Sequence, residues 1–410
     1  MAPFLQLSLL LAVLLTAAKL GGYLSTRLGQ PSVLGELVAG LILGPSLIDV
    51  LHLPFLNDHV VAETIHLLAE IGVLLLMFIA GLELHLSELV RNVGVSALAG
   101  VLGVVVPVAL GALAGLLFGF DTRSAFFLGL VLGATSVSIS AQTLMELRVL
   151  RSRVGLGLLG AAVFDDVLVI LLFSVFLALS AGGAAISEAL LIMVRMVVFL
   201  AGSVVLGLWG LPYLARRVAT LPISQGVLSL ALIVMLLYGL AAEVVGGMAA
   251  ITGTFLAGLM FGRSPEKSRL ESGVHALTYG LFVPIFLVNI GLLVNVRTLE
   301  SSALVMFLVL TLVAIVGKVV GCGLGARLGG FSWLESVQLG AGMVSRGEVG
   351  LIIANVGISQ GLLLDKELAV VVGLVLVTTL ITPPSLRFLF SKQKGEVGGK
   401  ESNFTGTREG

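Results

Sequence analysis

Charged residues are scarce in this 410-residue chain: Asp, Glu, Lys and Arg together make up 11%, whereas a soluble globular protein carries about 25%. Hydrophobic residues make up 58%, and long apolar runs recur from end to end. This composition excludes an ordinary soluble domain and predicts an all-α polytopic membrane protein that lies in a lipid bilayer. The formal net charge is zero, so no basic surface points to nucleic acid as a partner.

Cysteine is nearly absent as well. The single one, Cys322, excludes an intramolecular disulfide and a multi-cysteine metal site. We expect it to be a small packing residue within an apolar run. The five histidines lie in loops or near the ends of predicted spans, so we assign none of them a ligand or pH-sensing role. The first apolar run is longer than the core of a signal peptide and lacks a basic start, which predicts a first span.

Thirteen hydrophobic segments are long enough to cross a bilayer core of roughly 30 Å. Two of them, 32–48 and 246–262, are short and contain glycine. The segments are 4–24, 32–48, 64–84, 94–118, 124–146, 154–180, 187–214, 223–243, 246–262, 275–295, 302–325, 334–358 and 367–390.

The distribution of Lys and Arg predicts the orientation in the membrane. With the N-terminus outside, sixteen of the 23 basic residues fall in inner loops and the tail, three in outer loops and four inside spans. This bias predicts an external N-terminus and a cytoplasmic C-terminus. Residues 391–410 are polar and glycine-rich, which predicts a short disordered cytoplasmic tail.

The two halves of the chain resemble each other. GLELHLSEL (81–89) matches GLLVNVRTL (291–299) at an offset of 210, and LGLVLGATSVS (128–138) matches LGAGMVSRGEV (339–349) at an offset of 211. One transporter domain, 1–390, is therefore predicted to contain a first repeat (about 4–180), a connecting helix (about 187–214) and a second repeat (about 223–390). Six spans followed by one connecting helix give an inverted-topology repeat, as in many secondary transporters.

Two adjacent acids lie midway along the predicted span 154–180. Asp165 and Asp166 stand in the run GAAVFDDVLVILL, where each charge costs about 2.5–3.5 kcal/mol on insertion scales. Adjacent residues point about 100° apart around a helix, so one carboxylate can meet a cation of the protein while the other faces a water-filled cavity. One buried acid could serve packing alone, but two adjacent ones favour an ion or proton site.

Lys318 lies deep in the span 302–325, in AIVGKVVGCG, with no charge near it in sequence. Its central position argues against snorkelling to the interface. It needs a buried carboxylate, which the acid pair offers. A lysine also loses its proton readily when it is desolvated.

Two glycine-rich spans are predicted to be interrupted. GATSVSIS places Thr135 and Ser136 where hydroxyls and freed carbonyls suit a small cation, although small residues also serve helix packing in membranes. At the equivalent place of the second repeat, GAGMVSRGEVG carries Arg346 and Glu348. We expect these two to neutralise the dipole ends of broken helices, as structural supports rather than ion carriers.

In combination, these motifs resemble the monovalent cation:proton antiporter family 2, and most closely the NapA-type bacterial sodium/proton antiporters. The resemblance covers about 4–390 and rests on LAEIGVLLLMFIAGLEL (68–84), LGATSVSISAQTL (132–144), VFDDVL (163–168), VGKVVG (316–321) and MVSRGEVGLIIA (343–354). One departure is Ser345, which stands where many relatives have proline.

The resemblance implies a sodium (or lithium)/proton antiporter that works by alternating access as a homodimer. It implies a dimerisation domain, a core domain with crossed, unwound helices, and no cofactor besides the transported ions. Asp166 matches the ion-binding aspartate, Asp165 the partner of Lys318, and Thr135 and Ser136 the unwound segment near the sodium ion. The Asp-Asp pair marks the electrogenic branch.

Several rival functions are weighed against antiport. Potassium/proton exchange and cation-coupled symport fit the same residues, because no ligand set here separates sodium from potassium. A channel is less favoured because the site is titratable. An intramembrane aspartyl protease needs facing aspartates from two helices, and every other aspartate lies in a predicted loop, so we predict that the chain is not an enzyme.

Overall fold

The computed structural model describes residues 2–405 apart from 54–55, 57–58, 181–184, 265, 296, 298 and 300–302. Every regular element in the described part is a helix, as the sequence predicts. In the first half the helices are α1 (Pro3–Arg27), α2 (Ser32–Leu43), η1 (Val50–His52), α3 (His59–Glu83), α4 (Leu86–Arg91), α5 (Val93–Leu117), α6 (Thr122–Gly133), α7 (Val137–Glu146) and α8 (Arg153–Ser180).

The remaining helices begin with the longest unbroken element of the middle of the chain, α9 (Ala185–Ala219). They continue as α10 (Gly226–Ala241), η2 (Ala242–Gly246), α11 (Ala250–Phe261), α12 (Lys267–Leu277), η3 (Thr278–Phe282), α13 (Val283–Leu292), α14 (Leu304–Leu328), α15 (Trp333–Gly342), α16 (Glu348–Ser359) and α17 (Asp365–Thr405). Because η3 joins α12 to α13 without a break, these three cover the predicted span 275–295 together.

Ten helical stretches in the described residues are long and apolar enough to cross a membrane. Three further apolar helices are shorter: Ser32–Leu43, Ala250–Phe261 and Val349–Ile358. The first two coincide with the segments predicted to be short, and the third follows the predicted break in the span 334–358. The protein is thus an all-helical polytopic membrane protein, and thirteen crossings remain a prediction.

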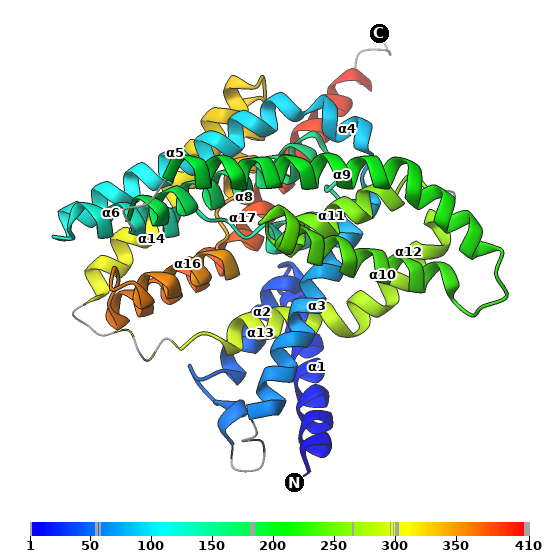
Figure 1. Ribbon diagram of the computed structural model, residues 1–410, viewed down its shortest axis with the longest axis horizontal. Helices are drawn as coiled ribbons and strands as arrows, with labels where there is room; N and C mark the ends of the chain where they lie inside the picture. The colour runs from blue at the N-terminus through cyan, green and yellow to red at the C-terminus, as the bar shows by residue number, and fades with distance from the viewer. Residues whose placement is uncertain are drawn as a thin grey trace.

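One boundary differs from the prediction. α2 ends at Leu43, not at 48, because Gly44 caps it in an extended conformation and Pro45 disfavours helical backbone in the residue before it. The last helix, α17, continues to Thr405 and leaves the helix bundle in Figure 1. The disorder of the tail 391–410 stays a prediction, and its last residues, 406–410, lie outside the described residues.

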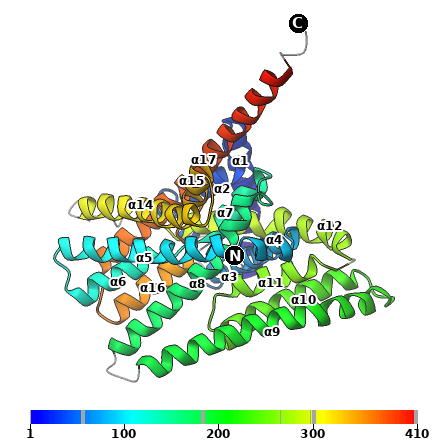
Figure 2. The ribbon, with the colours of Figure 1, turned by 90° about the horizontal axis from the view of Figure 1, so that it is seen from above.

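The helices form two groups of contacts. In the α1 group, which comprises α1–α3 and α9–α13, α2 packs on α1 and α13, while α11 packs on α3 and α10. In the α5 group, which comprises α5–α8 and α14–α17, α5 packs on α6, α8 and α14. Figure 2 shows α5, α6 and α14 on one side and α9, α10 and α12 on the other. The α5 group contains an apolar core of its own, with Val108, Phe127 and Leu374 among its buried side chains.

The predicted repeat makes α11 the equivalent of α2 and α13 the equivalent of α3, and the contacts of these helices correspond. In the first half α2 packs on α13, and in the second half α11 packs on α3. A Cβ atom added at Gly40 of α2 would lie 2.1 Å from the Val288 carbonyl oxygen, and one added at Gly258 of α11 would lie 2.0 Å from the Phe78 carbonyl oxygen. Close backbone approach at small residues is a common way to pack helices in a bilayer.

We expect Gly258→Ala to lower the unfolding midpoint of the purified protein, because the added methyl meets backbone that cannot rotate away. Overpacking of this kind costs about 1–3 kcal/mol. The matched control is Gly210→Ala in α9, where nothing lies within 4 Å of the added Cβ. Equal midpoints for the two variants in a thermal unfolding assay would contradict the close approach.

Candidate functional site

Two helices of the α5 group are interrupted, and their breaks lie together. α6 ends at Gly133 and α7 resumes at Val137, while α15 ends at Gly342 and α16 resumes at Glu348. The half-helices α6 and α15 both begin with a side-chain cap, Asp121 in one and Ser332 in the other. These caps lie 211 positions apart, which is the offset of the second repeat match.

The two breaks are bonded to each other. The Ser136 backbone N–H donates to the Ser345 carbonyl oxygen at 2.9 Å, and the Ser345 hydroxyl donates to the Ser136 carbonyl oxygen at 2.5 Å. The Ser140 hydroxyl donates to the Gly342 carbonyl oxygen and lies 3.3 Å from the Ser345 hydroxyl. Ser345 therefore supplies a hydroxyl that satisfies a carbonyl freed by the break.

Arg346 lies in the second break and bonds to the first. Its side chain is 1% exposed, and its guanidinium donates to the carbonyl oxygens of Ala134 at 2.8 Å and Ala314 at 3.1 Å. Ala134 is the C-cap of α6, where the helix dipole is negative. The guanidinium therefore lies at a negative helix end, and the supporting role of Arg346 stays a prediction. Glu348 is the first residue of α16, and its side chain lies outside the described part of the structure.

Asp165 and Lys318 form an ion pair between α8 and α14. Both side chains are buried, with 1% and 0% exposure. The Lys318 ammonium donates to one carboxylate oxygen of Asp165, while the other oxygen, Oδ2, has no hydrogen-bond partner among the described residues. Cys322, one turn beyond Lys318, is fully buried, as expected for a packing residue.

Asp166 faces a different direction, as helical geometry predicts for neighbouring residues. The Thr252 hydroxyl of α11 donates to its Oδ2 atom at 3.0 Å. This bond joins the α5 group to the α1 group. A cavity of about 10 Å³ adjoins it, which is about one water-sized sphere. The cavity is lined by Met77, Val137, Leu159, Ala162, Val163, Asp166, Ile251, Thr252 and Phe255.

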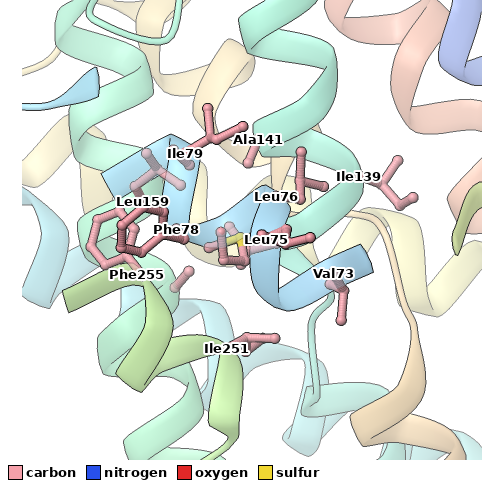
Figure 3. Packing of buried hydrophobic residues seen from close by; sticks show 14 of the residues in the cluster. Val73, Leu75, Leu76, Phe78, Ile79, Ile139, Ala141, Leu159, Ile251 and Phe255 are labelled. Atoms are coloured by element: carbon pink, nitrogen blue, oxygen red, sulfur yellow. The ribbon is translucent and has the colours of Figure 1, made fainter. Parts of the chain in front are cut away.

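Apolar side chains surround this carboxylate. Leu159, Ile251 and Phe255 line the cavity, and Figure 3 shows them in the same packed apolar cluster as Leu75 and Leu76 of α3. All five are buried. Low-dielectric walls strengthen the attraction of a carboxylate for a cation or a proton, so the arrangement suits reversible binding of one small positive ion.

The predicted ligands Thr135 and Ser136 are not among the residues that line the Asp166 cavity, and their role stays a prediction. Thr135 lies near Asp165, and its buried Oγ1 atom has no hydrogen-bond partner within the described residues. Ser136 lies against Gly347, where an added Cβ would approach its hydroxyl oxygen to 2.7 Å. Val137 is the residue of this segment that lines the Asp166 cavity.

Thr252 is the site residue that sequence reasoning missed. It stands in the run AAITGTF of the predicted span 246–262, where a single hydroxyl carries no signal of its own. The signal that could have pointed to Thr252 is the predicted shortness of that span, because a short span begins inside the protein, and Thr252 lies in the first turn of α11. Among the described residues no group of three or more His, Cys, Asp or Glu could hold a metal ion.

Comparisons with known proteins agree with this geometry. Residues 12–392 match the family model described as sodium/hydrogen exchanger, transmembrane. The Na⁺/H⁺-K⁺ antiporter GerN of Bacillus cereus is 40% identical over 380 residues, covering 93% of this chain and 95% of the relative. An Na⁺/H⁺ antiporter of Enterococcus hirae is 34% identical over 384 residues, covering 93% and 98%.

A solved structure shares the fold. The sodium proton antiporter MjNhaP1 from Methanocaldococcus jannaschii, at pH 8, superposes with a TM-score of 0.68 at 18% identity, covering 96% of this chain and 98% of that one. The relatives confirm the predicted resemblance to cation:proton antiporters, which are transporters rather than enzymes. The chain therefore belongs to the sodium/hydrogen exchanger family of multi-pass membrane antiporters.

Proposed function

We propose that this protein exchanges protons for sodium or lithium ions across the membrane, and that the exchange moves net charge. The observation that carries the proposal is the position of Asp166. Its carboxylate lies at the contact between the two helix groups, bonded to Thr252 beside a small cavity. A relative movement of the groups would open that contact toward one side of the membrane or the other, which is the requirement for alternating access.

In the proposed cycle, Asp166 releases a proton and binds the cation, with the Thr252 hydroxyl oxygen as a second ligand. Asp165 and Lys318 stay paired while the site holds no cation. Cation binding draws Asp165 away from Lys318, and the unpaired, buried ammonium gives up a second proton. Two protons exchanged for one monovalent cation transfer one net charge per cycle.

The proposal includes the membrane arrangement predicted from the sequence. The N-terminus faces outward and the C-terminus faces the cytoplasm of a bacterial cell, and the protein functions as a homodimer. The correspondence of the α2–α13 and α11–α3 contacts supports two inverted repeats. The hydrogen bonds between Ser136 and Ser345 support crossed, unwound helices in the moving group.

The direct test is proton flux in proteoliposomes under an imposed pH gradient, with sodium, lithium and potassium chloride added in turn. We expect sodium and lithium to dissipate the gradient. The reversal potential, measured at several sodium gradients, should follow two protons per cation. A reversal potential that fits one-for-one exchange would reject the electrogenic cycle, and no response to any cation would reject antiport.

Thr252→Val removes the hydroxyl that contacts Asp166 while keeping the side-chain volume. A hydrogen bond to a charged group contributes about 1.5–3 kcal/mol, so we expect the apparent KM for sodium to rise roughly 10-fold or more. The matched control is Thr254→Val, since Thr254 lies on the same helix and donates to the Ile251 carbonyl oxygen instead. An unchanged KM in Thr252→Val would remove Thr252 from the site.

Potassium/proton exchange is the second candidate. It is favoured by one specific observation, the name of the Bacillus cereus relative, which includes potassium beside sodium. The potassium arm of the flux experiment decides between them: a potassium response equal to the sodium response would replace the sodium-selective proposal.

A further inference from the structure

Two buried side-chain oxygens without hydrogen-bond partners in the described part of the structure lie on one face of α7, beyond the helix break. Ser138 and Gln142 are four residues apart, and Glu146 is four residues further on, so the three share a face. The first two are buried, with 0% and 6% exposure. Ser138 Oγ and Gln142 Oε1 lack hydrogen-bond partners among the described residues. A native structure leaves few buried polar atoms unpaired, and each needs an explanation.

At the far end of this face, Glu146 binds the first turn of α2. Its carboxylate accepts hydrogen bonds from the Ser32 backbone N–H at 2.5 Å, the Ser32 hydroxyl at 3.1 Å and the Val33 N–H at 3.4 Å. Ser32 is the first residue of α2, and Glu146 is the last residue of α7. From this contact both helices extend into the protein, α2 with increasing residue number and α7 with decreasing residue number. Figure 2 shows α2 and α7 near the middle of the molecule.

One turn inward from that contact, each helix presents an unsatisfied oxygen. On α7 it is Gln142 Oε1, and on α2 it is Glu36 Oε2. The Glu36 side chain is 6% exposed, and its other oxygen packs at Gly22 of α1, 3.2 Å from where a Cβ would stand.

The neighbours on the other side fix the direction of Gln142. Met145, one turn after it, accepts a hydrogen bond from the Tyr279 hydroxyl at 3.5 Å, and Lys19 donates to the Tyr279 carbonyl oxygen at 2.9 Å. Since Met145 faces η3 and Glu146 faces α2, Gln142 points between them. The Glu146 carboxylate and the Lys19 ammonium lie in this region together with two oxygen acceptors that lack donors within the described residues, Gln142 Oε1 and Glu36 Oε2.

We infer that Glu36, Gln142 and Glu146 form a second binding site for a monovalent cation, one that a sodium ion occupies on its way between Asp166 and the side of the membrane predicted to be cytoplasmic. The carboxylate and amide oxygens are the hard donors that such an ion prefers. The inference rests on the proposed function, because the second site would bind the same cation that Asp166 exchanges for protons.

The test measures sodium binding without transport. The full chain carrying Asp166→Asn is purified in detergent, and its unfolding midpoint is recorded in sodium chloride and in N-methylglucamine chloride of equal ionic strength. We expect sodium to raise the midpoint by about 2–4 °C, because a ligand that binds only the folded state stabilises it. The added change Glu36→Gln should abolish this rise.

A second variant separates loss of the site from misfolding caused by Glu36→Gln. Gln142→Met keeps volume and charge but removes the amide oxygen, and we expect it to reduce the sodium-dependent rise by at least about half. Glu70→Gln, which changes an exposed carboxylate of α3, should leave it intact. Absence of the rise in Asp166→Asn, or its survival in Asp166→Asn/Glu36→Gln, would overturn the second site. Failure of the antiport proposal is seen separately, as absent flux in the wild type.

Discussion

Proteoliposomes carrying Asp166→Asn are expected to show no sodium-driven proton flux above that of protein-free vesicles. The substitution keeps the shape of the side chain and an oxygen that can accept the Thr252 hydrogen bond, but it removes both the titratable group and the negative charge. Without the charge, a cation in a site walled by apolar side chains loses its main attraction. The measurement is the sodium-induced recovery of an imposed pH gradient.

The matched control for this loss is Asp49→Asn. Asp49 lies outside the long helices, pairs with His52 and has a left-handed backbone conformation, with φ at 58°, which asparagine tolerates well. We expect this variant to retain wild-type flux. If Asp166→Asn is as active as Asp49→Asn, the assignment of the ion site to Asp166 is wrong.

Lys318→Met is expected to destabilise the protein more than any other single change discussed above. It leaves Asp165 buried with no ammonium beside it, and breaking one partner of a buried pair costs about 3–5 kcal/mol. Arg346 also acts on Asp165, but its guanidinium is held by the Ala134 and Ala314 carbonyl oxygens. It cannot replace Lys318, and the unfolding midpoint should fall by several degrees.

Removing both partners should restore much of that stability. In Asp165→Asn/Lys318→Met no unpaired charge remains at the pair, and exchange of a buried ion pair for neutral residues is often close to neutral. A double-mutant cycle of unfolding midpoints measures the coupling. Additive effects of the two substitutions would show that the pair contributes nothing, and would remove it from the proposed cycle.

Much of the site could be anticipated because it rests on local features of the chain. Long apolar runs fix the helices, and glycines with hydroxyl residues mark both breaks, at 134–136 and 343–347. The divergence of Asp165 and Asp166 follows from helical geometry alone. Their charges in an apolar run then predict a need for Lys318, and the structure places the two ends of that pair together.

The parts that escaped prediction depend on contacts between distant segments. Thr252 belongs to the site only because α11 packs against α3 and α8 brings Asp166 to it. Nothing near Thr135 or Ser136 in sequence shows that Val137 would take the place beside the cavity. Likewise, Glu146 binds the start of α2 across 114 positions, which no periodicity or composition can reveal.

The wide separation of Asp165 and Lys318 along the chain matters during synthesis of the protein. The two residues are 153 positions apart, and a ribosome that adds about 5–20 residues per second needs roughly 8–30 s to cover that distance. For most of this interval α8 is complete, with its acid pair, while the lysine that pairs with Asp165 has not yet been made. The nascent first half must therefore hold an uncompensated acid at the membrane until α14 arrives, which makes α14 the step that completes assembly.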